Sequence, residues 1–141
     1  MHLISPALRN YSGSQVTNLI KKDVERGDIW LVNLDPSRKG ELGKNNRPCI
    51  VIQTTEANKI LPTVAIIPLS SKKQESELEI KLTPDKTNNL KKISYVIWWH
   101  IYTVNKYNLN NKVGCVDNKS FDEIVENMKD TLGFSEIFEI M

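Results

Sequence analysis

The chain has 141 residues, a formal net charge of +2, and a composition that is 40% hydrophobic and 26% charged. This balance is typical of one globular domain and excludes a disordered chain. No apolar run reaches the roughly 20 residues of a membrane-spanning helix, and the first residues lack the basic and apolar regions of a signal peptide. We therefore expect a cytoplasmic protein without a membrane partner. The small positive charge does not by itself predict nucleic-acid binding.

The cysteines and histidines do not form a pattern that binds metal or builds a disulfide scaffold. Cys49 and Cys115 are the only cysteines, and both are expected to be buried thiols. His2 and His100 lie far apart, with no Cys/His cluster around them. We therefore expect a protein without a metal or another cofactor.

Residues 1–25 are expected to form an N-terminal leader, and residues 26–141 a single small domain. Ser14 could cap a short helix that runs through about Glu25. The apolar residues that would share one face of this helix are Val16, Leu19, Ile20 and Val24.

A series of short apolar segments predicts β-strands. Pro48–Gln53 and Thr63–Leu69 are almost continuously apolar, which predicts strands buried on both faces. Leu78–Leu82 alternates between apolar and charged residues, which predicts a half-exposed strand. Pro84–Lys92 is expected to be a polar loop. The other predicted strands are Ile29–Leu34, Ile93–Trp99 and Lys112–Val116.

One amphipathic helix is predicted near the C-terminus. Ser120 is the expected N-cap, with Glu123 at the capping-box position, and Gly133 is expected to end the helix. Short strands followed by one helix predict a mainly β fold, a small barrel or strongly bent antiparallel sheet. The residues at helical spacing are Phe121, Ile124, Val125, Met128 and Leu132.

The segment Ser37–Arg47 is long for a hairpin connection and rich in charge. Arg47 stands at the entrance to a buried strand, so its guanidinium needs a nearby anion or carbonyl group. Spacing alone favours a salt bridge with a local acid, and a substrate phosphate is the functional alternative. The other charged residues of this segment are Arg38, Lys39, Glu41 and Lys44.

Two hydroxyl side chains follow the next buried strand. Ser70 and Ser71 come directly after its last apolar residue. They could cap a turn, or they could lie beside Arg47 at the open end of the sheet and contact a substrate phosphate. The residues alone leave both interpretations open.

Several motifs, taken in order, resemble the MazF/PemK toxins of type II toxin–antitoxin systems. Residues 26–36 read RGDIWLVNLDP, like the family's opening strand, and residues 47–53 read RPCIVIQ, like its Arg-Pro strand. Residues 68–71 read PLSS, which matches a strand end of the family, and Lys112-Val113-Gly114 precedes the helix. The resemblance covers residues 25–134, and the shared order of the motifs makes it specific.

The resemblance implies an SH3-like, CcdB-type barrel that works as a homodimer and is bound by a cognate antitoxin protein. It also implies a metal-independent endoribonuclease that cuts single-stranded mRNA within short sequence motifs. In this family the RNA 2′-OH attacks the adjacent phosphorus, which gives a 2′,3′-cyclic phosphate and a 5′-OH. The matching positions make Arg47, Ser70 and Glu41 the expected catalytic residues. Arg47 would mainly stabilise the charged phosphorane, because a guanidinium is a poor proton donor.

The chain departs from the family at positions expected to contact RNA. Two charged family positions are Tyr102 and Asn105 here, which puts the cut-site preference in question. Tyr102 could stack on a base and His100 could carry a proton, or both could pack against the domain. A CcdB-like gyrase poison and an inactive binding module remain alternatives. The expected substrate-binding residues are Arg38, Lys39, Gly40, Lys44, Asn46, Ser71, His100 and Tyr102.

Overall fold

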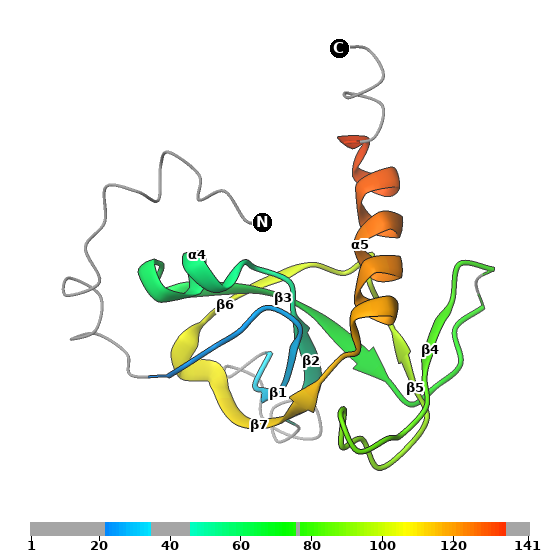
Figure 1. Ribbon diagram of the computed structural model, residues 1–141, viewed down its shortest axis with the longest axis horizontal. Helices are drawn as coiled ribbons and strands as arrows, with labels where there is room; N and C mark the ends of the chain where they lie inside the picture. The colour runs from blue at the N-terminus through cyan, green and yellow to red at the C-terminus, as the bar shows by residue number, and fades with distance from the viewer. Residues whose placement is uncertain (1–21, 35–45, 76, 135–141) are drawn as a thin grey trace.

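A computed structural model describes residues 22–34, 46–75 and 77–134 (Figure 1). Most of the predicted N-terminal helix lies outside these residues, but its expected last turn, residues 22–25, is not helical. Tertiary contacts explain this difference, because Val24 is buried in a core cluster and the Glu25 N–H donates to the Asp28 carboxylate. No helix of the described part of the chain is long and apolar enough to cross a membrane.

All the predicted strands are present, with shifted bounds. Three further elements were not predicted: α4 (Thr55–Ile60), β6 (Tyr102–Asn105) and the 3-10 helix η1 (Lys106–Asn108). The remaining elements are β1 (Asp28–Val32), β2 (Arg47–Val51), β3 (Thr63–Ser70), β4 (Ile80–Leu82), β5 (Ser94–Val96), β7 (Leu109–Cys115) and α5 (Asn118–Leu132).

The strands form one bent antiparallel sheet in the order β4-β5-β3-β2-β1-β7, with β6 also paired to β3. One edge of β3 pairs with β2, and the other edge is shared by two strands. β6 pairs along Thr63–Ile66, whereas β5 pairs at Leu69 and Ser70. The sheet bends along β3, between the part that pairs with β6 and the part that pairs with β5. The helix α5 extends above the sheet in the view of Figure 1. The predicted fold class is therefore confirmed.

The central strands are buried on both faces, as their continuous apolar sequences predicted. Ile50 and Ile67 belong to one core cluster, which also contains Ile124 and Met128 of α5. Their neighbours in the sequence, such as Val51 and Ile66, belong to a second cluster on the other side of the sheet. Side chains of a strand alternate between its two faces, so β2 and β3 separate the two cores.

The C-terminal helix begins three residues earlier than predicted. Asp117, not Ser120, is the N-cap: its carboxylate accepts a hydrogen bond from the Ser120 N–H at 3.0 Å. The expectation was wrong because the first turn of the helix is polar and has no apolar residue to mark it. The predicted end is correct, since Gly133 has a left-handed φ of 81° that favours glycine.

Lys106 in η1 is a buried charge, with only 2% of its surface exposed. Its ammonium group donates to the Asn58 carbonyl in α4. Burial lowers the pKa of Lys106 from its ordinary value of 10.5, because the charged form loses solvation. The side chain joins η1 to the last turn of α4, and the lowered pKa makes this contact sensitive to pH.

We expect Lys106→Met to change how stability depends on pH. The unfolded chain binds the Lys106 proton more tightly than the folded protein does, so raising the pH favours folding. The wild-type free energy of unfolding should therefore rise, relative to that of the variant, as the pH approaches 10.5 from neutrality. Urea unfolding of both proteins across that range measures this difference. Parallel curves for the two proteins would contradict the assignment.

Candidate active site

A cavity of about 590 Å³ opens where β2 begins and β3 ends. We call it the Arg47 cavity. Its lining is mainly apolar and includes four basic side chains, and none of the described residues that line it is acidic. The lining residues are Leu31, Asn46, Arg47, Pro48, Leu69, Ser70, Ser71, Lys72, Asn89, Leu90, Lys91, Lys92, Ser94 and Val113. A hollow with this size and charge is suited to an anionic ligand that also has an apolar part.

Arg47 is the first residue of β2 and lies opposite Val32 of β1. Its guanidinium donates one long hydrogen bond, of 3.4 Å, to the Leu69 carbonyl at the end of β3. The ion pairs found among the described residues are Lys112–Asp28 and Lys129–Glu126, so neither involves Arg47. Within the described residues Arg47 therefore has a carbonyl partner and no acidic one. No described residue accepts a hydrogen bond from the remaining guanidinium donors, which can bind an anion in the cavity.

Ser70 fixes a turn and also lies in the cavity beside Arg47. Its hydroxyl oxygen accepts a hydrogen bond of 3.1 Å from the Lys72 N–H, which fixes the turn after β3. The same side chain lines the cavity together with Arg47 and Ser71. A hydroxyl group that accepts one hydrogen bond still has a proton to donate. Ser70 can therefore act on an anion while it holds the turn.

Cys49 lies two residues after Arg47 but takes no part in the cavity. Its thiol is buried and donates to the Arg47 carbonyl at 3.5 Å. Burial raises the pKa of Cys49 to about 12, and the nearby charge of Arg47 only partly opposes this rise. The thiol therefore stays protonated and is a poor nucleophile. Cys49 is a buried thiol, as predicted, whereas Cys115 is only half-buried.

A sequence profile of the PemK-like, MazF-like toxins of type II toxin–antitoxin systems matches residues 25–132 of this chain. The chain belongs to this family. The match spans every strand and both α-helices of the described residues, and it confirms the family that the sequence motifs predicted. It covers Arg47 and the other residues that line the Arg47 cavity of this PemK/MazF-family toxin.

Two curated relatives agree with this membership. The endoribonuclease MazF of Staphylococcus saprophyticus is 27% identical over 115 residues, which are 81% of this chain and 95% of that protein. The endoribonuclease EndoA of Bacillus subtilis is 27% identical over 110 residues, covering 77% of this chain and 94% of that protein. The predicted enzyme class agrees with both names.

Two solved structures have a similar fold. A crystal structure of MazF from Deinococcus radiodurans has a TM-score of 0.65 at 17% identity, covering 80% of this chain and 99% of that chain. An endoribonuclease from a mycobacterial species, solved in complex with its cognate antitoxin, has a TM-score of 0.62 at 19% identity. That alignment covers 78% of this chain and 95% of the mycobacterial one. The bent sheet with one C-terminal helix is therefore the fold of this toxin family.

The structure brings together only some of the predicted site residues of this PemK/MazF-family toxin. Arg47, Ser70, Ser71 and Asn46 share the Arg47 cavity. The other residues predicted in the preceding loop are Arg38, Lys39, Gly40, Glu41 and Lys44, and they lie outside the described part of the chain.

His100 and Tyr102 lie on a different surface. Tyr102 pairs with Ile66, four residues before Ser70 on β3, which is roughly 13 Å along a strand. The rings of His100 and Tyr102 lie edge to face, with 6.3 Å between their centroids, and both side chains are exposed. Partial burial of His100 was one interpretation of the sequence, and it is wrong. Neither residue lines the Arg47 cavity.

One part of the cavity lining was not predicted from the sequence. Lys72 was not among the predicted site residues, and the loop that carries Asn89, Lys91 and Lys92 was predicted simply to be polar. These residues line the cavity together with Arg47. No group of three or more His, Cys, Asp and Glu side chains that could hold a metal ion occurs in residues 22–34, 46–75 and 77–134.

Proposed function

We propose that this toxin is an endoribonuclease that cuts single-stranded mRNA within short sequence motifs, and that the Arg47 cavity is its active site. One observation carries the proposal: Arg47 and Ser70 come from different strands and line one basic cavity that has no described acidic side chain. These are the residues that the family resemblance assigns to catalysis. The names of the two curated relatives support the same activity.

The proposed reaction needs no metal, because the RNA supplies the nucleophile. The 2′-oxygen gives up its proton and bonds to the adjacent phosphorus, and the bond from phosphorus to the 5′-oxygen breaks. The leaving oxygen takes up a proton, so the products are a 2′,3′-cyclic phosphate and a 5′-OH. Arg47 would stabilise the charged phosphorane and Ser70 would orient the phosphate. Glu41, which lies outside the described residues, remains the proposed loop carboxylate.

Two protein partners belong to this proposal. The first is a cognate antitoxin with an acidic, partly disordered tail, which would bind the basic rim as a mimic of RNA phosphates. The second is another copy of this chain. Trp99, Ile101 and Leu132 are exposed around one shallow apolar cleft beside α5, and a dimer interface could cover them. Trp98 lines the same cleft but is only 3% exposed.

Incubation of the purified toxin with a long single-stranded RNA of known sequence tests the proposed activity. In the presence of EDTA we expect cleavage at a small number of sites, with 5′-OH ends and cyclic phosphates on the other ends. Mapping of the 5′ ends would define the cut motif. Intact RNA, with or without added divalent cations, would contradict the proposal, and gyrase inhibition by the same sample would favour the CcdB-like alternative.

A further inference from the structure

The loop between β4 and β5 is held in shape by its own side chains. The Asp85 carboxylate accepts hydrogen bonds from the N–H groups of Thr87 and Asn88 at 2.8 and 2.7 Å. The buried Asn88 side chain accepts from the N–H groups of Asp85 and Leu90 at 3.0 Å and donates to the Thr83 carbonyl. These local bonds satisfy backbone groups that have no partner strand in the loop. The loop therefore has one defined shape.

The same loop is fixed against β7. The Asn89 amide donates to the Val113 carbonyl at 3.0 Å, and the Cys115 N–H donates to the Thr87 carbonyl at 3.1 Å. The two backbones come so close that a Cβ on Gly114 would lie 2.5 Å from the Thr87 oxygen. Only glycine allows this approach. The position of the loop over β7 is thus set by one backbone hydrogen bond, by the side-chain hydrogen bond of Asn89 and by the close backbone approach at Gly114.

This arrangement carries Lys91 and Lys92 to the rim of the Arg47 cavity. The Ser94 hydroxyl donates to the Lys92 carbonyl at 3.1 Å, which fixes the backbone where the loop enters β5. In β5, Tyr95 pairs with Ser70 of β3, so the loop ends beside the strand that carries the cavity's serine. Both lysines are exposed, and neither belongs to an ion pair found among the described residues.

We propose that Lys91 and Lys92 form a phosphate subsite for a nucleotide that flanks the cleaved bond, an inference that rests on the proposed function. Their charges stand on a preorganised loop, across a cavity that also holds Arg47. The described lining contains no acidic side chain that would neutralise them. An RNA chain supplies phosphates at regular intervals, and the apolar floor at Leu90 and Val113 suits the base of the flanking nucleotide. The subsite fixes the position of the RNA chain, whereas Arg47 acts on the reacting phosphate.

Salt-dependent binding tests this assignment, because each neutralised phosphate adds about 0.7 to the slope of log affinity against log salt for a single strand. The probe is a short fluorescein-labelled oligonucleotide with 2′-deoxyriboses, which cannot be cleaved by 2′-OH attack. We expect Lys91→Ala and Lys92→Ala each to reduce the magnitude of the slope by roughly 0.7. Binding should weaken to a similar extent for probes of different sequence, because phosphates carry no base identity.

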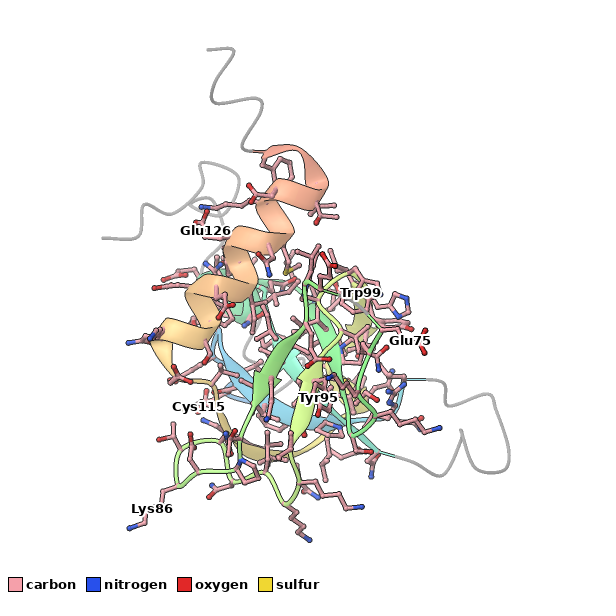
Figure 2. The ribbon with its side chains drawn as sticks, turned by 90° about the vertical axis from the view of Figure 1, so that its right-hand side faces the viewer. Glu75, Lys86, Tyr95, Trp99, Cys115 and Glu126 are labelled. Atoms are coloured by element: carbon pink, nitrogen blue, oxygen red, sulfur yellow. The ribbon has the colours of Figure 1, made fainter. Side chains whose placement is uncertain are left out.

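Lys86→Ala is the matched control, because it removes the same charge from the same loop. Figure 2 shows Lys86 at the outer tip of the loop, directed away from Tyr95 on β5, and it does not line the cavity. Its slope should equal that of the wild type. If Lys91→Ala and Lys92→Ala have the same salt slope as Lys86→Ala, the two lysines do not form a phosphate subsite. Cleavage of unmodified RNA by the wild type is scored separately, so a failure of the nuclease proposal is recognised independently of the subsite.

Discussion

Replacement of Arg47 by alanine should slow RNA cleavage by roughly 100-fold or more, the usual effect of losing one preorganised group that stabilises transition-state charge. Arg47→Lys should not restore the rate, because an ammonium group cannot make the paired hydrogen bonds of a guanidinium. Substrate binding should weaken far less, since the other cations of the cavity rim remain. Single-turnover cleavage with the wild type and both variants measures these effects.

The same variant also decides between the two interpretations of Arg47. A structural salt bridge would make Arg47→Ala lower the melting temperature together with the rate. In the structure Arg47 makes one hydrogen bond, of 3.4 Å, to a described residue, and a bond of this length contributes less than about 1 kcal/mol. We therefore expect the variant to melt close to the wild type.

Lys73→Ala is a suitable control, because Lys73 is exposed, lies near the cavity and does not line it. Its rate and melting temperature should both match the wild type. If Arg47→Ala stays folded and cuts RNA at the wild-type rate, Arg47 has no part in the reaction. A large fall in its melting temperature would instead support the structural interpretation.

The sequence predicted the elements whose burial follows a simple pattern. β2 and β3 separate two cores, so nearly every residue in them is apolar, and continuous apolar runs identified them. β6 has only Val104 buried, which leaves no alternation to detect. α4 has six residues, and Thr54 as its N-cap and Pro62 after its end were the only available signals. Short elements that are held by tertiary contacts leave little trace in the sequence.

The candidate site was predictable on one side and hidden on the other. Arg47 and Ser70 lie at strand ends, where a charged or hydroxyl residue stands out beside an apolar run. Lys91 and Lys92 belong to an ordinary polar sequence, and they reach the cavity only because Gly114 lets the loop lie against β7. That approach depends on strand pairing and on backbone contacts between distant segments. Neither the charge of the residues nor their spacing along the chain predicts this pairing or these contacts.

We expect Asp28 to contribute strongly to the free energy of unfolding. It is only 2% exposed, and its carboxylate accepts hydrogen bonds from the Glu25 N–H at 2.9 Å and the Trp30 indole at 3.1 Å. It also pairs with Lys112 of β7 at 3.1 Å, and this contact raises the pKa of Lys112. Asp28 thus fixes the turn before β1, and the same carboxylate joins β1 to β7.

We expect Asp28→Ala to lower the free energy of unfolding by about 3 kcal/mol, because it leaves the buried Trp30 indole N–H and the partly buried Glu25 N–H without an acceptor, at roughly 1–3 kcal/mol each. Lys112→Ala is the comparison: it removes the ion pair but keeps both hydrogen bonds of the Asp28 carboxylate, and the Lys112 side chain is 45% exposed, so its loss of stability should be smaller. Urea unfolding of both variants measures the difference. Asp28 does not line the Arg47 cavity, so Asp28→Ala should cut RNA at nearly the wild-type rate wherever it remains folded. Equal losses of stability in the two variants would mean that Glu25 and Trp30 find other acceptors, and that the ion pair is the main contribution of Asp28.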